Sequence, residues 1–134
     1  MNNDLSQTES LLTDLKKQIK TSNAEVMVAP TFTNLYHAFE ALKTTDIEVI
    51  AQNMHFAENG AYTGEISAAM LKSVGVQTVI LGHSERREYF NETDELLAKK
   101  VDAALANKMR IIFCFGEELA DRKSGNEEAI VGSQ

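Results

Sequence analysis

The sequence is poor in the features that mark several classes of protein. A single cysteine, Cys114, leaves no disulfide framework and favours a reducing compartment. No apolar run reaches membrane-spanning length, and the opening MNNDLSQTESLL has neither the charge nor the apolar core of a signal peptide. The formal net charge of -7 offers no basic surface to nucleic acid or an anionic membrane. We therefore expect a cytoplasmic protein with no nucleic-acid partner and no membrane partner.

Short motifs for metals and dinucleotides are also missing. None of His37, His55 and His83 shares a metal-ligand spacing with a neighbouring Cys, Asp or Glu, so a zinc site is unsupported. No Gly-x-Gly-x-x-Gly follows a strand, which argues against a dinucleotide-binding fold. A flavodoxin-like receiver domain fits the length, but the acidic cluster that it needs at the tip of the first strand is absent. Neither of these doubly wound folds suits the sequence.

The elements that are present alternate along the chain. The length of 134 residues with 43% hydrophobic residues suits one globular domain. Apolar runs rich in β-branched residues predict four buried strands, at Ala24–Pro30, Ile47–Asn53, Gln77–Gly82 and Arg110–Glu117. Helical spacing predicts helices at about Ser6–Lys20 (on Leu11, Leu12, Leu15 and Ile19), Leu35–Leu42, Ile66–Val74, Thr93–Asn107 and from Asn126 onward. This order predicts a parallel sheet with helices packed on it, within a single domain.

Polar residues follow the predicted strands, where α/β folds gather their chemistry. We expect four strand ends to converge on one face of the sheet: Ala29–Pro30, Gln52–Asn53, Gly82–His83 and Gly116–Glu117. Any one of them could instead simply cap a helix or turn the chain, as Thr31 or Thr33 could for the second helix. Gly82 favours a functional role for His83, because glycine lets the backbone bend sharply. At a helix N-terminus an imidazole is favoured in its neutral form and can donate to a substrate oxygen.

A long loop and the single cysteine are further candidates for a functional role. Met54–Glu65 has no periodicity and two glycines, so it is predicted to be a loop, and its length is typical of functional loops. Cys114 could be a nucleophile, but the apolar residues around it favour a packed, inert thiol.

The string VILGHSERR (Val79–Arg87), preceded by AQN and GAYTGEIS and followed by FCFGE, resembles the triosephosphate isomerase family. These segments occur in the family's order over nearly the whole chain. The resemblance implies an α/β fold of the (β/α)8 TIM-barrel type, which takes about 250 residues. Residues 1–134 would then form a single partial domain, about half a barrel of four parallel strands with flanking helices. It would lack the first strand and the last three.

The resemblance also implies an activity and roles for individual residues. The family interconverts dihydroxyacetone phosphate and glyceraldehyde 3-phosphate through an enediolate, in glycolysis and gluconeogenesis, with no cofactor and no metal. His83 would be the electrophile, and Ser84 would hold the carboxylate base while the site is empty. Glu85 resembles the supporting acid near the catalytic lysine. GAYTGE resembles the interface loop of a homodimer, in which Thr63 approaches the partner's active site and Glu65 pairs with Arg86 of the partner subunit.

The sequence departs from the family at its ends. Met1–Asn2 resembles the pair that follows the catalytic lysine, so we expect the lysine, the glutamate base, the lid and the phosphate loops to be missing. A start codon assigned inside a longer gene is one hypothesis. We expect this chain alone to be inactive. Its sheet would have two open edges and an apolar face, so it should associate, aggregate or bind a complementing barrel segment.

Two other functions remain open. The first is a non-catalytic half-barrel that acts as an assembly or binding module through its open edges and the loop Ala61–Glu65. The second is a phosphate-binding α/β domain of another barrel family. It is disfavoured because Glu117 and Glu118 follow Gly116 where the phosphate should bind.

Overall fold

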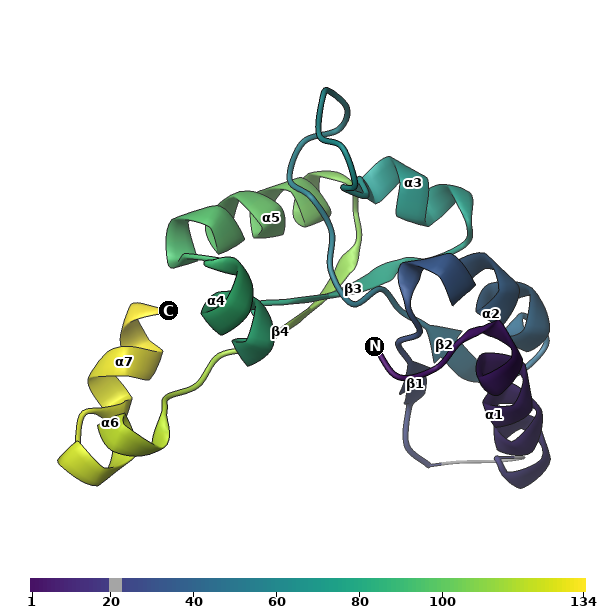
Figure 1. Cartoon of the computed structure of the whole chain (residues 1–134), viewed down its shortest axis with the longest axis horizontal. Coiled ribbons are helices and arrows are strands. Elements are labelled where there is room, and N and C mark those ends of the chain that lie inside the picture. Colours follow the sequence, from purple (N-terminus) through teal and green to yellow (C-terminus); the bar gives the residue numbers. More distant parts are fainter. Residues whose placement is uncertain (20–22) are drawn as a thin grey trace.

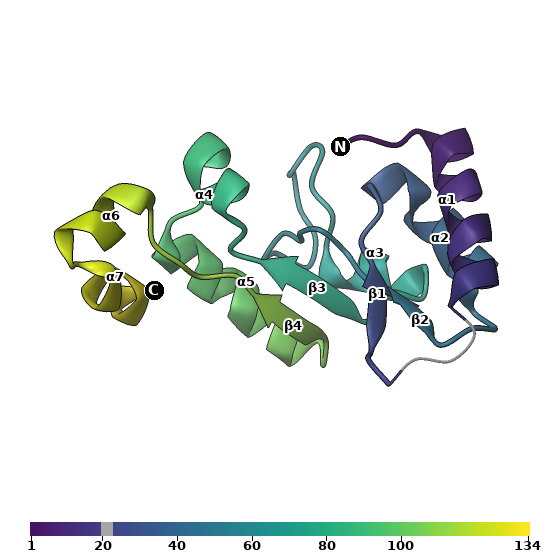
Figure 2. The ribbon, with the colours of Figure 1, turned by 90° about the horizontal axis from the view of Figure 1, so that it is seen from below.

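Two pairs of parallel strands form the centre of the computed structural model, which describes residues 1–19 and 23–134 (Figures 1 and 2). Strands β1 (Val26–Val28) and β2 (Ile47–Val49) pair with each other, as do β3 (Thr78–Leu81) and β4 (Arg110–Phe113). Ala51 joins the pairs: it bridges to Val79, accepts from the Ile80 N–H at 2.8 Å and donates to the Thr78 carbonyl at 2.9 Å. The strands therefore lie side by side in chain order, and the predicted parallel α/β architecture is confirmed.

The strands are shorter than predicted. Each apolar run continues into residues that leave the sheet, and the reason is clear at two of the ends. Pro30 has no N–H to give to a ladder. Gly82 has a φ of +83° in the left-handed region, so the chain turns away directly after β3.

Helix α1 (Leu5–Gln18) begins at Asp4, which forms a capping box with Gln7. Leu12 is buried as predicted, but Leu11 is 47% exposed and is not part of the buried stripe. One residue of offset turns a side chain by about 100° around a helix, so neighbouring leucines cannot share one narrow face. The predicted end of this helix, Lys20, lies outside the described residues.

The remaining helices separate and cover the strands. They are η1 (Phe32–Asn34), α2 (Leu35–Leu42), α3 (Ala68–Ser73), α4 (Ser84–Phe90), α5 (Asp94–Ala106), α6 (Leu119–Ser124) and α7 (Glu127–Ser133). The expected cap of α2 by Thr31 or Thr33 is wrong. Thr31 precedes η1 without a side-chain cap, Thr33 lies inside η1, and Asn34 precedes α2. The short 3-10 turn places one extra element between the threonines and the helix.

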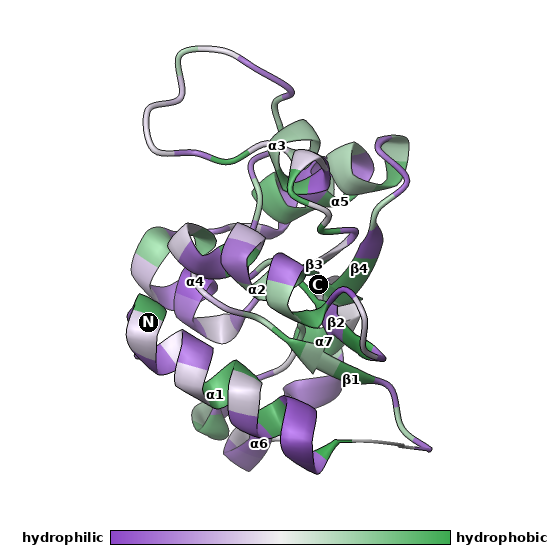
Figure 3. Ribbon diagram, turned by 90° about the vertical axis from the view of Figure 1, so that its right-hand side faces the viewer, coloured by the Kyte–Doolittle hydropathy of each residue, from purple (hydrophilic) through white to green (hydrophobic). Residues whose placement is uncertain are grey.

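The core lies between the strands and the helices on one side. Helix α2 packs on β2 and on α1, while α5 packs on β3 and β4 (Figure 1). Val49 and Val79 are buried, whereas Ile80 and Ile112 are only half-buried and lie outside the core cluster. Alternate strand residues point to opposite faces, so the helix-covered face is buried and the other is left partly open. Figure 3 shows β1 and β3 largely hydrophobic and α6 mostly hydrophilic.

The stretch 54–65 contains no helix or strand, as predicted, and protrudes from the body (Figure 1). Its tip, residues 58–65, is exposed. The loop is held by its own contacts: the Glu65 N–H donates to the Tyr62 carbonyl at 3.0 Å, and the His55 and Tyr62 ring centroids are 4.3 Å apart. Among the described residues, no helix has both the length and the apolar character needed to cross a membrane.

Candidate active site

His83 stands at the carboxyl end of β3 and directly precedes helix α4, as its N-cap. Its Nδ1 accepts a hydrogen bond from the Glu85 backbone N–H at 3.3 Å. An acceptor nitrogen carries no proton, so the ring is neutral and its N–H is on Nε2. The side chain is 49% exposed. This arrangement leaves one N–H of the imidazole available to a ligand oxygen.

A cleft of about 930 Å³ opens in front of this histidine, between the tips of β3 and β4 and the α6–α7 pair. Gly82, His83 and Ser84 line one wall, and Gly116 and Glu117 belong to the other. The far wall is held by Gln134, whose side chain accepts from the Gly116 N–H at 3.0 Å and donates to the Gly116 carbonyl at 2.9 Å. Two of the four predicted strand ends therefore meet at one cavity.

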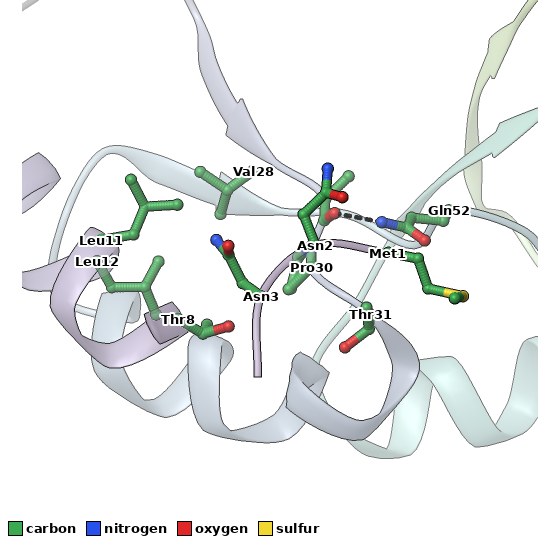
Figure 4. Close-up of a pocket in the computed structure, with 11 residues that line it drawn as sticks. Met1, Asn2, Asn3, Thr8, Leu11, Leu12, Val28, Pro30, Thr31 and Gln52 are labelled. Carbon is green, nitrogen blue, oxygen red and sulfur yellow. Dashed lines mark hydrogen bonds between the residues drawn. The ribbon is translucent and has the colours of Figure 1, made fainter. Parts of the chain in front are cut away.

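The other two strand ends do not line this cleft, although all four strands are parallel and so end at the same edge of the sheet. Gln52 donates from Nε2 to the Ala29 carbonyl at 2.8 Å and lines a separate cleft of about 280 Å³ beside α1 (Figure 4). Asn53 is buried and binds Lys100. Backbone hydrogen bonds join the two strand pairs at Ala51, and side chains link them where Thr78 contacts Glu48 and Arg110 contacts Glu25, but the pairs line separate clefts.

Acidic side chains dominate the lining of the larger cleft: Glu88, Glu117, Glu118 and Asp121. Apart from His83, the basic side chain among the described residues that line it is Arg87. A hydrogen bond from the backbone, supported by one from Arg122, keeps the pKa of Glu117 below its ordinary value. The cleft therefore carries negative charge on the side opposite His83.

Arg87 ties the two strand tips together. It donates from Nε to the Gly82 carbonyl at 2.8 Å, from Nη2 to the Cys114 carbonyl at 3.3 Å and from Nη1 to Asp94 Oδ1 at 2.6 Å. A Cβ on Gly82 would lie 2.5 Å from the Cys114 carbonyl oxygen, so only glycine fits between the tips. Sequence reasoning did not assign a role to Arg87, although its place four residues after His83 puts it one helical turn away.

A buried cluster of charges lies behind α4. The side chains of Glu92 and Lys100 are each 3% exposed and form an ion pair. Glu92 Oε1 also accepts from Arg86 Nε at 2.7 Å, and Lys100 Nζ donates to Asn53 Oδ1 at 2.9 Å. Burial raises the pKa of the Glu92 carboxyl, but the hydrogen bonds from Lys100 and Arg86 outweigh it and hold that pKa below its ordinary value.

The sequence contained one sign of this cluster. Lys100 falls at helical spacing from Leu97 and Ala104, both buried, so its position alone places a lysine in the core. A lysine in that place requires an acid and polar partners, because an isolated buried charge is very costly. Glu92 lies just outside the helix, where periodicity gives no information.

The other predicted catalytic residues lie near His83. Ser84 lines the same cleft. Glu85 Oε2 is 3.7 Å from His83 Nδ1, but its side chain is 72% exposed. That distance is longer than a hydrogen bond and the contact is screened by solvent, so it does not displace the backbone N–H from Nδ1.

The predicted interface residues lie apart from the cleft. Thr63 and Glu65 are exposed in the protruding loop. Arg86 faces the buried cluster within its own chain and stacks on Phe90, with its Cζ 4.5 Å from the ring centroid. Phe90 is itself 62% exposed, so this guanidinium borders an apolar surface.

Two residues weighed for other chemistry have clear positions. Cys114 is half-buried and lines the cleft, so it is less enclosed than the packed thiol expected from its apolar neighbours. His37 is a surface residue of α2, with Nε2 3.3 Å from Glu9 Oε1. Residues 1–19 and 23–134 contain no group of three or more His, Cys, Asp or Glu residues arranged to hold a metal ion.

Comparison with known proteins identifies the family of the chain. The family model for triosephosphate isomerase matches residues 1–134. The chain is 60% and 56% identical over 135 residues to the triosephosphate isomerases of Flavobacterium johnsoniae and Flavobacterium psychrophilum, and 49% identical over 134 residues to that of Clostridium acetobutylicum. Each match covers 100% of this chain and 54% of the relative. The chain therefore spans about half the length of these relatives.

Proposed function

Because this chain belongs to the triosephosphate isomerase family, we propose that it is part of an enzyme that interconverts dihydroxyacetone phosphate and glyceraldehyde 3-phosphate. The reaction moves a proton between adjacent carbons through an enediolate and serves glycolysis and gluconeogenesis, and we propose that the enzyme works in the cytoplasm. The observation that carries the proposal is the neutral imidazole of His83, which faces the cleft at the tip of β3.

His83 has the geometry of an electrophile. As a base removes the proton from one carbon, negative charge develops on the neighbouring carbonyl oxygen. The Nε2–H of His83 donates to that oxygen and stabilises the enediolate, and it needs no rearrangement because the Glu85 N–H already holds Nδ1. Ser84, beside it, would hold the carboxylate base in the empty site, and Glu85 would support the catalytic lysine.

The chain alone lacks the rest of this machinery. The carboxylates that line the cleft repel a phosphate dianion, and Arg87 has its donors committed to Gly82, Cys114 and Asp94. The base, the lysine and the phosphate-binding groups must come from other strands of a complete barrel. Loss of the base and of substrate anchoring removes most of the catalytic effect, so the chain by itself should not turn over substrate.

A coupled isomerase assay tests the proposal. The 134-residue chain is assayed alone and after mixing with a polypeptide that supplies the remaining strands of a family member. Turnover is expected only in the mixture and should fall by at least 100-fold with His83→Gln, since the oxyanion donor is lost. An active mixture that His83→Gln leaves unchanged would contradict the assignment of His83.

We also propose a second copy of the same protein as partner. The exposed loop would enter that copy, so that Thr63 approaches its active site and Glu65 meets Arg86 of the partner subunit. Glu92 supports this geometry because it fixes the guanidinium of Arg86 at an exposed apolar surface that includes Phe90.

One alternative is favoured by the half-buried Ile80 and Ile112: a non-catalytic half-barrel that acts through its open face and the loop Ala61–Glu65. The response to a transition-state analogue distinguishes it, because Thr63→Arg should abolish association under the homodimer proposal as well. Under this alternative Thr63→Arg abolishes association, while a transition-state analogue has no effect on the chain in any mixture.

A further inference from the structure

Arg87 uses three separate donor atoms on three separate elements. Nε contacts the residue after β3, Nη2 contacts the residue after β4, and Nη1 contacts Asp94 at the start of α5. A guanidinium is planar and presents its donors in a fixed fork, so three such contacts fix both its position and its plane. The side chain is 20% exposed, which limits competition from water.

The Gly82 contact acts on the peptide unit that leads into His83. A peptide group is planar, so holding the Gly82 carbonyl oxygen also orients the His83 N–H and the direction of the chain at its Cα. Gly82 is the position where this direction is least determined, because glycine at a φ of +83° has no side chain to pack. An external contact is therefore needed to fix the direction in which the imidazole leaves the backbone.

The Cys114 contact continues the sheet beyond its last ladder bond. The Cys114 N–H donates to the Leu81 carbonyl at 2.8 Å, and no strand residue follows on either side. Directly beyond it, the carbonyls of Gly82 and Cys114 point to the same guanidinium. Both oxygens carry partial negative charge, and the guanidinium that they share offsets the repulsion between them. Arg87 takes the place of the ladder at the point where the wall of the cleft begins.

We propose that Arg87 is a positioning residue for His83: it holds the Gly82–His83 peptide against the tip of β4 so that the imidazole faces the cleft with its proton on Nε2. This inference rests on the proposed role of His83. A lysine at this position keeps the charge but has a single nitrogen, so it cannot contact both carbonyls and Asp94 together.

The test measures directly which tautomer the His83 imidazole adopts. Two-bond 1H–15N correlation spectra of the labelled 134-residue chain report which ring nitrogen of each histidine carries the proton, and His83→Gln assigns the His83 signals. Arg87→Lys is expected to move the two His83 nitrogen resonances toward each other, as the two neutral tautomers begin to exchange. His37 and His55 are internal standards, because a general loss of structure would shift all three histidines.

Two further variants keep the test decisive. Asp94→Asn leaves Arg87 in place but removes the charged contact that aligns it, so a smaller shift in the same direction is expected even if Arg87→Lys folds poorly. Arg122→Lys is the matched control, since Arg122 binds Glu117 on the side of the cleft opposite His83, whereas the Gly82 carbonyl accepts from Arg87. In the complemented enzyme, Arg87→Lys should lower kcat by about 10-fold with little change in KM, because a misplaced catalytic group slows the chemical step.

The proposal is overturned if the His83 nitrogens are unchanged in both Arg87→Lys and Asp94→Asn, or if the parent chain already shows an even mixture of tautomers. These spectra need no substrate. An inactive complemented enzyme with the expected spectra would therefore count against the proposed function and leave the positioning role supported.

Discussion

At the scale of single residues, the Glu92 carboxylate is buried and binds two cationic side chains. One of its oxygens receives both Lys100 and Arg86, and the other is buried without a hydrogen-bond partner among the described residues. Removing one member of a buried pair leaves the other charge uncompensated, which costs about 3–5 kcal/mol. Glu92 therefore joins α4, α5 and, through Lys100, the Asn53 loop into one unit.

This carboxylate predicts a specific pH dependence. The pKa of Glu92 is lower in the folded chain than in the unfolded chain, so its contribution to stability is complete above the ordinary carboxyl pKa of about 4.3 and is lost as the pH falls through the folded value. Glu92→Gln should destabilise by about 3 kcal/mol near pH 7, and the difference from the parent should shrink below about pH 4. Unfolding curves at a series of pH values measure this difference.

Glu25→Gln is the control, because Glu25 is also paired, with Arg110, and its pKa is also lowered, but its side chain is 55% exposed. Its effect should be much smaller at every pH, since solvent screens the pair. A Glu92→Gln difference that stays constant down to the acid limit would contradict the assignment.

Two glycines with similar backbone angles give a second prediction. Gly82 (φ +83°) and Gly64 (φ +93°) both lie in the left-handed region, but a Cβ on Gly82 meets the Cys114 carbonyl at 2.5 Å while Gly64 has no atom within 4 Å. Gly64→Ala should cost only the conformational strain, about 1–2 kcal/mol. Gly82→Ala should cost at least twice as much in urea unfolding, because it also separates the strand tips. If the two variants lost equal free energy of unfolding, the tips of β3 and β4 would be able to move apart at no cost.

At the scale of elements, helix α5 supports the candidate site from behind. It packs on both β3 and β4, and Thr93 caps it by accepting from the Leu96 N–H at 3.3 Å. Thr93→Ala should lower the free energy of unfolding by about 1 kcal/mol, whereas Thr93→Ser, which keeps the hydroxyl, should be close to the parent. Thermal unfolding of the two variants measures the difference. If Thr93→Ser lowered the free energy of unfolding as much as Thr93→Ala, the effect would come from the methyl group of Thr93 and not from its hydroxyl.

The elements differ in how far the sequence could predict them. Helix α5 was predicted within one residue at each end because Thr93, the periodic leucines and Asn107 all agree. Helix α6 was not predicted, since its six residues bury no side chain and leave no apolar period. The exposure of Leu11 was missed because adjacent leucines look alike in the sequence until the packing of α1 on α2 decides which one is covered.

The candidate site was predicted in part. His83 could be located from Gly82 and the strand before it, which are local signals. The Arg87 contacts and the buried pair of Glu92 and Lys100 depend on distances between separate elements, which spacing along the chain does not contain.

At the scale of the whole molecule, the face of the sheet opposite the helices is only partly covered. Ile80 and Ile112 are opposite each other in the β3–β4 register and lie on this face. The edges of β1 and β4 make no strand pair among the described residues. Open edges and apolar surface favour pairing with another chain, so the isolated chain should associate in sedimentation experiments.

Charge on that face should oppose association. Ile112→Lys is expected to reduce the associated fraction by at least 5-fold at equal concentration, because pairing would then bury a lysine. Leu105→Lys is the matched control, since Leu105 is 59% exposed on α5. A parent chain that sediments as a monomer and unfolds in one sharp transition would refute the expectation.

Among the described residues, the backbone of each strand pairs only with strands that are its neighbours in chain order. The entropy lost on closing a loop grows with loop length, so each pairing here joins segments that are already close along the chain. During synthesis, each strand is therefore expected to be able to pair as soon as the next strand has left the ribosome. Order can therefore advance from the amino end while translation continues.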